Sequence, residues 1–454
     1  MVSASLRGFL DSRLPRYPEE LADLVAIDSP SSHREGTEEV GRWFAERYRA
    51  LGAEVAFEPG ALAGMRAPLE PPGNVARHLL ATFRGKGGGR LLLLGHMDTV
   101  FPVGEAAKRP FRVEGGRAYG PGVADMKGCL LAALYALEGL LASGFGSFGE
   151  ILLLYDSDEE VGNPSSRPLI EKLAAGCDAV LVLESARSDG SLVSARKGNS
   201  LFRLEVEGVA AHAGVEPEKG RSAVLELAHK VVAAHAIARA GSGGPRVGPP
   251  SGPGRFARSP EPPSITGDSE ELALSLRPGS TDFDELSRIE LAKVGGRGTV
   301  NVTRLSGGAR PFIVPPEAAA TVEFRAYSPA ELARMEGELR ALAGRTYVQG
   351  TRTRLTHLGG RPAMERSEGT ARLVALAQEV ARAGGFEVAE SATGGTSDGN
   401  YTAALGVPTL DGLGPVGGNL HREDEYLEVP SVPERAWLLG EMVRRLGEGG
   451  TFNR

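Results

Sequence analysis

Cysteine is nearly absent from this chain, with only Cys129 and Cys177 among 454 residues. Two cysteines exclude a disulfide framework and favour a compartment that keeps thiols reduced. The first residues lack the apolar run of an export signal, and no later stretch is long and apolar enough to cross a membrane. The sequence therefore predicts a cytoplasmic protein that has no membrane partner.

An excess of basic residues is lacking too, since 51 Lys and Arg stand against 58 Asp and Glu, for a net charge of −7. This balance offers no positive field for nucleic acid, and no basic motif with interleaved aromatic residues occurs. The hydrophobic share of 41% and the charged share of 24% are typical of globular proteins. At 454 residues the chain is too long for one ordinary core, so more than one domain is expected.

What the chain does contain is three short apolar runs, each followed by acidic residues or a histidine. They lie in Arg90–Val100, Ile151–Gly162 and Ala179–Ser185. Unbroken apolar runs of this length are typical of strands that are buried on both faces of a parallel sheet. The polar residues that follow the runs are His96, Asp98, Asp156, Asp158, Glu159, Glu160 and Glu184. Because ligands of such sheets bind outside the carboxyl ends of the strands, these side chains are expected to gather at one edge.

Acids gathered at one edge repel one another unless a cation neutralises them. Adjacent Glu159 and Glu160 cannot face the same way, so one can bind a metal while the other acts as general base toward a water molecule. The alternative for these two residues alone is a solvated acidic turn. Three successive runs with the same kind of ending favour the metal site.

Two aspartates suit such a metal site. Asp98 follows His96 by two residues, so in an extended segment its carboxylate can accept a hydrogen bond from the far ring nitrogen. The alternative is a turn histidine beside a turn aspartate. Asp125 precedes a helix predicted to begin near Met126, and it would cap that helix, bridge two metal ions, or do both.

The pattern changes after residue 198. Residues 199–358 predict an α+β domain of strand-helix-strand-strand-helix-strand order, inserted into a larger domain. The larger domain, residues 1–198 and 359–454, is predicted to be α/β, with a mixed, mostly parallel sheet and helices on both faces. Residues 240–263 carry seven Pro and six Gly and are expected to form a flexible surface loop.

The expected strands are 55–57, 74–83, 201–207, 299–304, 319–326 and 346–356. The expected helices are two within 16–51, broken around 29–32, and those over 163–173, 223–238, 331–343, 370–383 and 434–446. A glycine loop at 393–400 opens a further helix, and backbone amides there favour an anion such as a substrate carboxylate. His421 lies among acids and, in isolation, is typical of a surface residue.

The motifs HMDTV, GPGVADMKG, DSDEEVG, VLES, AAHAG, GGTSDG and NLHREDEY follow one another across most of the chain. In this order they resemble the zinc metallopeptidase family that contains aminoacylase, acetylornithine deacetylase, succinyl-diaminopimelate desuccinylase and the glutamate carboxypeptidases of the carboxypeptidase G type. The runs SSRPLI and GGRPAM make the last group the nearest match. The resemblance implies a zinc-exopeptidase-like fold, and the order of the motifs is far more specific than any one of them.

The resemblance also implies a site for two zinc ions, with cobalt or manganese as alternatives. The implied ligands are His96, Asp125 and Glu184 for one ion, and Asp125, Glu160 and His421 for the other. Glu159 would take a proton from water, and Asp98 would orient His96. By the same resemblance the inserted domain forms a homodimer, in which His212 of one chain stabilises the oxyanion in the site of the other.

For the carboxylate of the substrate, the resemblance assigns Lys197, Arg325, Arg361, Gly394 and Gly395. Arginine suits this task because its guanidinium binds a carboxylate through two parallel hydrogen bonds. The chain departs from the family at Phe312, where the family usually has Asn. A phenyl ring cannot make the hydrogen bonds of an amide, so substrate specificity is expected to differ.

The expected function is therefore two-zinc hydrolysis of the amide bond in a peptide or N-acyl amino acid that has a free carboxylate. One alternative is a deacylase that releases lysine, arginine or ornithine from its N-acyl form. Another is a non-catalytic relative that binds metabolites or regulates a partner. Glu184, in place of Asp, is typical of the carboxypeptidase and deacylase branches, and Phe312 is the one feature that favours the non-catalytic alternative.

Overall fold

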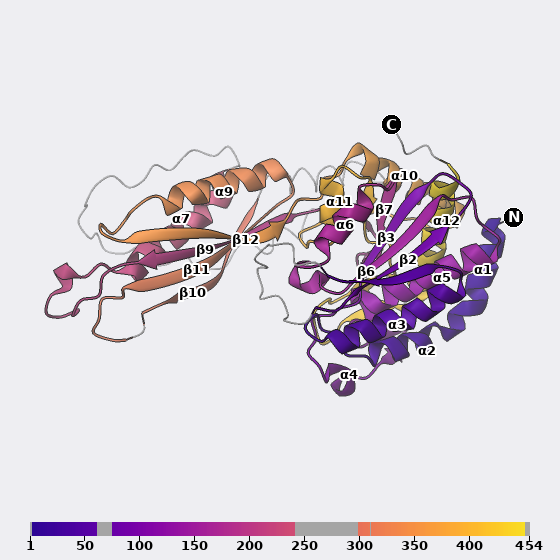
Figure 1. Cartoon of the computed structure of the whole chain (residues 1–454), viewed down its shortest axis with the longest axis horizontal. Coiled ribbons are helices and arrows are strands. Elements are labelled where there is room, and N and C mark those ends of the chain that lie inside the picture. Colours follow the sequence, from indigo (N-terminus) through magenta and orange to yellow (C-terminus); the bar gives the residue numbers. More distant parts are fainter. Residues whose placement is uncertain (1, 61–74, 241–297, 309, 450–454) are drawn as a thin grey trace, which may run out of the picture.

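The computed structural model describes residues 2–60, 75–240, 298–308 and 310–449. Figure 1 shows two units side by side, a larger α/β unit and a smaller unit with one sheet under two helices. The first and last described helices belong to the larger unit, and the described residues from β9 (Gly198–Glu207) to β12 (Arg352–Arg361) form the smaller one. The arrangement agrees with an inserted domain, and the exact boundaries predicted at 199 and 358 stay predictions.

The central sheet of the described residues has six strands in the order β1-β2-β6-β3-β7-β14. Their bounds are β1 Glu54–Glu58, β2 His78–Arg84, β3 Arg90–His96, β6 Glu150–Asp156, β7 Ala179–Val182 and β14 Thr409–Leu410. The strands from β6 to β14 run parallel, whereas β1 and β2 join antiparallel at one side. The predicted mixed, mostly parallel sheet is confirmed.

Alternate residues of the central strands face opposite sides of this sheet. Leu91 and Leu93 of β3 belong to one core, and Leu92 and Leu94 belong to another. The helices of the first core are α1 Val2–Arg13, α2 Tyr17–Val25, α3 Arg34–Ala50, α5 Gly128–Ala142, α10 Glu368–Ala383 and α12 Val432–Glu448, and those of the second are α6 Arg167–Ala174 and α11 Gly399–Ala404. Helices therefore cover both faces (Figure 1), which is why β3 is apolar without alternation.

Two small sheets hold the connections that lead to the site. The first is antiparallel in the order β15-β16-β5-β4, and in the second β8 and β13 pair in parallel. Their bounds are β4 Arg112–Glu114, β5 Arg117–Tyr119, β8 Leu192–Arg196, β13 Glu390–Thr393, β15 Gly417–Gly418 and β16 Tyr426–Glu428. Because β5 precedes Asp125 and β16 follows His421, the first small sheet brings two distant parts of the chain together.

The smaller unit has an antiparallel sheet in the order β10-β11-β9-β12, with α7 and α9 packed on it. Along the chain its elements are β9 Gly198–Glu207, α7 Ala223–Ala240, β10 Thr299–Gly307, β11 Glu317–Ala326, α9 Pro329–Ala343 and β12 Arg352–Arg361. Within the described residues, this order of strands and helices agrees with the predicted order. The glycine- and proline-rich stretch lies outside the described residues from 241 onward.

One strand of this unit was predicted too early. The prediction began it at 346, but β12 begins at Arg352, and residues 346–351 form a turn. The buried carboxylate of Glu226 accepts hydrogen bonds from the backbone amides of Tyr347 (2.8 Å) and Val348 (2.6 Å). These amides are therefore satisfied by a side chain, and no strand neighbour is needed there.

The remaining short elements are α4 Glu105–Lys108, η1 Leu14–Arg16, η2 Val123–Lys127, η3 Glu159–Val161, η4 Pro217–Lys219 and η5 Val429–Ser431. Of these, η2 and η3 carry candidate site residues. Within the described part of the chain, no helix combines the length and the apolar character that a membrane span requires.

Candidate metal centre

The carboxyl ends of β3, β6 and β7 meet at one edge of the central sheet. His96 is the last residue of β3 and pairs in register with Asp156 of β6. Glu159 and Glu160 follow in η3, and Glu184 follows β7 by two residues. The predicted convergence of these side chains at the sheet edge is thus present in the structure.

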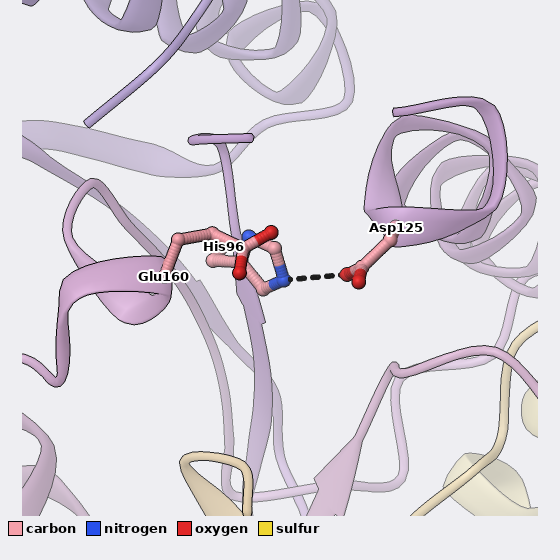
Figure 2. A group of neighbouring side chains, drawn as sticks. All are labelled: His96, Asp125 and Glu160. Carbon is pink, nitrogen blue, oxygen red and sulfur yellow. Dashed lines mark hydrogen bonds and ion pairs between the residues drawn. The ribbon is translucent and has the colours of Figure 1, made fainter. Parts of the chain in front are cut away.

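Asp125 lies between His96 and His421, two histidines that are far apart in the sequence. Its Oδ1 lies 3.0 Å from Nε2 of His96, and its Oδ2 lies 3.1 Å from Nε2 of His421. Figure 2 shows Asp125 reaching His96 from the segment before α5, while Glu160 approaches from η3. One carboxylate therefore has a different histidine at each of its two oxygens.

Each histidine also has its own glutamate. Oε1 of Glu184 lies 3.7 Å from Nε2 of His96, and Oε2 of Glu160 lies 3.3 Å from Nε2 of His421. The contacts therefore divide into two half-sites, each with one imidazole nitrogen, one glutamate oxygen and one oxygen of Asp125. This division agrees with the two ligand sets that the resemblance implies.

The donor set fits a divalent metal ion. Ligand atoms of His96, Asp125 and Glu160 all lie within 4.8 Å of one another. Oε1 of Glu160 is buried without a hydrogen-bond partner, and burial together with nearby Asp125 raises the pKa of Glu160 to about 8. A buried carboxylate with one unpartnered oxygen is stabilised by a cation, and nitrogen and carboxylate donors suit zinc.

Asp98 contacts both His96 and the acidic turn. The nearest group to Nδ1 of His96 is the backbone carbonyl of Asp98 at 2.9 Å, while the Asp98 carboxylate lies at 3.4 Å. The carboxylate accepts hydrogen bonds from the hydroxyl of Ser31 (2.6 Å) and from the backbone amides of Glu159 (3.3 Å) and Glu160 (3.2 Å). Asp98 thus orients the ring mainly through its backbone, and its side chain holds the turn of the two glutamates.

Two of the acids near this edge belong to other contacts. The Asp158 carboxylate accepts hydrogen bonds from the hydroxyls of Ser165 (2.6 Å) and Ser166 (2.5 Å). The Asp156 carboxylate accepts one from the backbone amide of Asp158 (3.2 Å). Asp125 is also no helix cap, because α5 begins only at Gly128 and its carboxylate is taken up by the histidines.

Glu159 binds Arg361 and lies outside the two half-sites. Nη1 of Arg361 lies 2.5 Å from Oε1 of Glu159, and Nη2 donates to the Glu159 backbone carbonyl (2.6 Å). Nη2 also donates to the Asn163 side chain (2.6 Å), and Nη1 to Thr396 (3.0 Å). Arg361 is buried, and burial outweighs this arginine to raise the pKa of Glu159. Arg361, which was expected to bind substrate, therefore binds Glu159, the candidate general base.

A pocket of about 640 Å³ opens over the two half-sites. Asp125, Glu160, Glu184 and His421 lie in its wall, and Thr303, Glu323 and Arg325 of the smaller unit form part of the opposite wall. The candidate metal centre thus faces a cavity that both units line.

Four of the predicted substrate ligands gather beside this pocket. Nη1 of Arg325 donates to the carbonyl of Gly394 (3.0 Å), and its guanidinium also binds Glu323 (2.7 Å). The Lys197 side chain lies next to Gly394, and Gly395 lines the pocket. The glycine loop therefore offers Arg325 a carbonyl, and α11 begins only at Gly399.

Two pocket arginines were not predicted. Arg196 is buried, with Nε 2.7 Å from Oδ2 of Asp411 and Nη1 donating to the Gly395 carbonyl (3.3 Å). Arg187 lines the pocket and is exposed, and the structure of the described residues shows no acidic partner for it. In the sequence, both arginines follow short apolar runs. That position is common to pocket residues and surface residues, so it did not identify them as pocket residues.

His212 and Phe312 lie elsewhere. His212 forms a bridge with Ile313, and the carbonyl of Phe312 accepts a hydrogen bond from the backbone amide of Ala213 (2.9 Å). His212 follows the end of β9 opposite to Asn199, which lines the pocket. Leu201 of β9 also lines the pocket, and the strand continues for roughly 20 Å to Glu207 before the segment of His212, so His212 lies away from the pocket of its own chain.

Several known proteins are similar to this chain in sequence or in fold. The sequence profile described as "Peptidase family M20/M25/M40" matches residues 92–445. Carboxypeptidase G2 of Pseudomonas sp. (strain RS-16) is 28% identical over 438 residues, covering 96% of this chain and 90% of the relative. A succinyl-diaminopimelate desuccinylase of Xanthomonas campestris pv. campestris (strain B100) is 30% identical over 376 residues, covering 80% and 85%. The crystal structure of a tripeptidase from Staphylococcus aureus is similar in fold, with a TM-score of 0.68, 20% identity and coverage of 96% and 99%.

Proposed function

The chain belongs to peptidase family M20/M25/M40, whose members are hydrolytic metalloenzymes, and from this membership we propose a two-zinc mechanism of amide hydrolysis. The proposed substrate is a peptide or an N-acyl amino acid with a free carboxylate. The observation that supports it most is the position of Asp125, with one oxygen beside His96 and the other beside His421. A carboxylate between two histidines is the geometry that a shared ligand of two metal ions requires.

The proposed ligands are His96, Asp125 and Glu184 for one zinc ion, and Asp125, Glu160 and His421 for the other. Cobalt or manganese would suit the same donors. When bound, these ions supply Lewis acidity toward a water molecule and toward the scissile carbonyl. The residues around them then determine where the proton goes and how the substrate lies.

Glu159 is proposed as the general base. It is buried at the pocket wall beside Glu160, and its carboxylate is left out of both half-sites. It would take a proton from the attacking water and deliver it to the nitrogen of the leaving amine, so the proton is conserved. Asp98 supports this role because it holds the backbone amides of both glutamates.

The substrate carboxylate is assigned to the basic side of the pocket. Arg325, Lys197 and the Gly394–Gly395 loop lie together there, and Arg361 lies next to Glu159. Arg187 adds a cation that has no acidic partner among the described residues. An anionic substrate is therefore favoured over a neutral or basic one.

Two substrate classes, peptides and N-acyl amino acids, fit the proposal, because the similar proteins include both a carboxypeptidase and a desuccinylase. Carboxypeptidase action would release an amino acid from the carboxyl end of its substrate, and deacylation would release an acyl group such as succinyl. A non-catalytic relative is disfavoured, because Glu159 is present and each of the two histidines contacts Asp125 and one of the two proposed glutamate ligands.

A panel of amides tests this proposal. The zinc-loaded protein would be offered N-acyl amino acids and dipeptides that end in glutamate, lysine or alanine, each beside its carboxamide. We expect hydrolysis of the free acids, with the acidic residues preferred, and at least tenfold less with the carboxamides. Equal rates for acids and carboxamides would contradict the carboxylate requirement, and no hydrolysis at all would contradict the enzymatic proposal.

A homodimer is proposed in addition. His212 lies beyond the end of β9 that points away from the pocket, with roughly 20 Å of strand between Leu201 and that end, so it can stabilise an oxyanion only in the site of a second subunit or after a large movement. Phe312 lies in the neighbouring segment with 78% of its surface exposed, and a partner subunit would cover it.

A further inference from the structure

One buried carboxylate outside the proposed ligand set contacts the backbone of Asp125. Glu425 is the residue before β16, and none of its surface is exposed. Its Oε1 accepts hydrogen bonds from the amides of Ala124 (2.8 Å) and Asp125 (3.0 Å), and its Oε2 accepts one from Gly122 (3.2 Å). Glu425 therefore binds three backbone amides of the segment that carries Asp125, the proposed bridging aspartate.

This segment has amides that no strand can satisfy. β5 pairs with β16 as far as Tyr119, which lies opposite Tyr426. Beyond Tyr119 the chain turns at Gly120 and Gly122, both with positive φ, and leaves the sheet. Buried amides after such a turn need another acceptor. The Glu425 carboxylate supplies it, directly beyond the last pair of the two strands.

Glu425 also closes the loop that carries His421. The backbone amide of Glu425 donates to the carbonyl of Arg422 (3.2 Å), and the amide of Arg422 donates to the carbonyl of Asn419 (3.1 Å). His421 lies inside the Asn419–Arg422 turn, directly before the turn that Glu425 closes, with a φ of 64°. The same residue thus fixes the loop of one proposed ligand through its backbone and the loop of another through its side chain.

We propose that Glu425 is a positioning residue that sets the distance between Asp125 and His421. The side chains of Asp125 and His421 lie 3.1 Å apart, although their two segments are about 300 residues apart in the sequence. The proposal rests on the proposed metal centre for its consequence, since a fixed spacing matters only to a ligand that both residues bind. Groups that hold the ligands of a metal typically alter its affinity about 10- to 100-fold when they are removed.

Only a carboxylate suits this position. It has acceptor capacity on both oxygens, whereas the amide of glutamine has one acceptor oxygen and one donor nitrogen. In a Glu425→Gln variant, one of the two sides would present N–H to N–H, either at Gly122 or at the pair Ala124 and Asp125. The variant keeps the size of the side chain, so it tests the hydrogen bonds more than the packing.

A matched control lies three residues further along the chain. Glu428 is on β16, and its carboxylate binds the exposed Arg117 (2.8 Å), away from the Gly122–Asp125 segment. Glu428→Gln makes the same chemical change on the same strand. Glu425→Asp serves as a second variant, because it keeps the charge and shortens the reach.

Two measurements on the purified full chain test the proposal. The first is amide hydrogen exchange of the metal-free protein over a peptide that covers residues 120–127. The second is zinc affinity, measured by competition with a chromophoric chelator and followed, for Co²⁺, by the visible absorption spectrum. We expect Glu425→Gln to lose protection in this peptide, to bind zinc about tenfold or more weakly and to change the cobalt spectrum, while Glu428→Gln behaves as the wild type.

Wild-type protection and wild-type zinc affinity in Glu425→Gln would overturn the proposal. A variant that loses global stability but binds zinc normally once folded would also overturn it, because the role would then be only structural. If Glu425→Gln does not fold, the same criteria apply to Glu425→Asp. If the wild type itself binds no zinc, the metal centre fails, and hydrogen exchange still decides whether Glu425 holds the segment.

Discussion

Glu159 and Glu160 are neighbours in the chain, yet they contact different parts of the site. Glu159 binds Arg361, and Glu160 binds His421. The short helix η3 separates their directions, while Asp98 holds both backbone amides. The two side chains have the same chemistry, so their different positions alone give them different expected roles.

Exchanging each for glutamine separates these roles. Glu159→Gln should keep both metal ions and lower kcat by about two to four orders of magnitude, because the general base is lost. Glu160→Gln should weaken metal binding, because a proposed ligand is lost. Metal content by mass spectrometry and steady-state kinetics on the same preparations measure both effects. Metal loss from Glu159→Gln together with full metal in Glu160→Gln would reverse the assignment.

Most of the candidate ligands could be predicted because parallel strands present their carboxyl ends at one edge. His96, Glu160 and Glu184 follow that rule directly. The contact of Arg361 with Glu159 could not be predicted, since it joins residues 202 apart and depends on how β12 enters the larger unit. Glu425 was missed for the same reason, because its partners lie about 300 residues earlier.

The helix α3 is tied to the start of β2 by one ion pair. The Glu38 carboxylate accepts hydrogen bonds from Nε (3.0 Å) and Nη2 (2.8 Å) of Arg77 and a further one from Arg34 (3.0 Å). The bonds from Arg77 are the main cause that lowers the pKa of Glu38 to about 2. Glu38 is buried while Arg77 is partly exposed, so solvent weakens the pair.

This ion pair predicts a pH-dependent stability. Because the folded pKa lies below the ordinary value of 4.5, the contribution is complete above about pH 4.5 and is lost as the pH falls toward 2. Glu38→Gln should therefore lower the free energy of unfolding by about 1 kcal/mol at pH 7, and the difference from the wild type should shrink below pH 4.5. Denaturant unfolding of the metal-free proteins measures it. The exposed neighbour Glu39→Gln is the control, and a difference that stays constant from pH 7 to pH 3 would contradict the prediction.

Whole elements were predicted more reliably than their ends. The two helices predicted between 16 and 51 are present, and the described elements of the smaller unit follow the predicted order, because each depends on periodicity over many residues. The late start of β12, at Arg352 and not at 346, and the late start of α5 depend on single side chains, Glu226 and Asp125, that bind groups far away. Local patterns do not contain such contacts.

At the scale of the whole molecule, metal content is the first quantity to measure. The purified chain should hold close to two divalent ions, and dialysis against a chelator should abolish hydrolysis and lower Tm, because the ions bind only the folded state. Addition of zinc should restore both. A protein that contains one ion and is fully active would contradict the two-metal proposal.

His212 provides a test of the proposed dimer. His212→Ala should keep its metals and its dimeric state and lower kcat by about two to three orders of magnitude, as for loss of one oxyanion donor. Mixing it with Glu159→Gln should restore part of the activity, since one site of a heterodimer then has its own Glu159 and the partner's His212. Exchanged chains that stay inactive would show that His212 does not act across subunits, and a fully active monomer would contradict the dimer.

The chain passes between the two units through one pair of strands, β9 and β12, in the part that the structure describes. At the crossing, Gly198 and Gly360 leave no room for a side chain, since an added Cβ would lie 2.5 Å from the Ala363 nitrogen and 2.1 Å from the Asn199 oxygen. Two paired strands with closely packed backbones therefore connect the two cores. A rotation of about 10° of the smaller unit about this crossing would move the far end of β9 by about 5 Å. Asn199 and Arg361, which pair at the crossing and line the cavity, would hardly move.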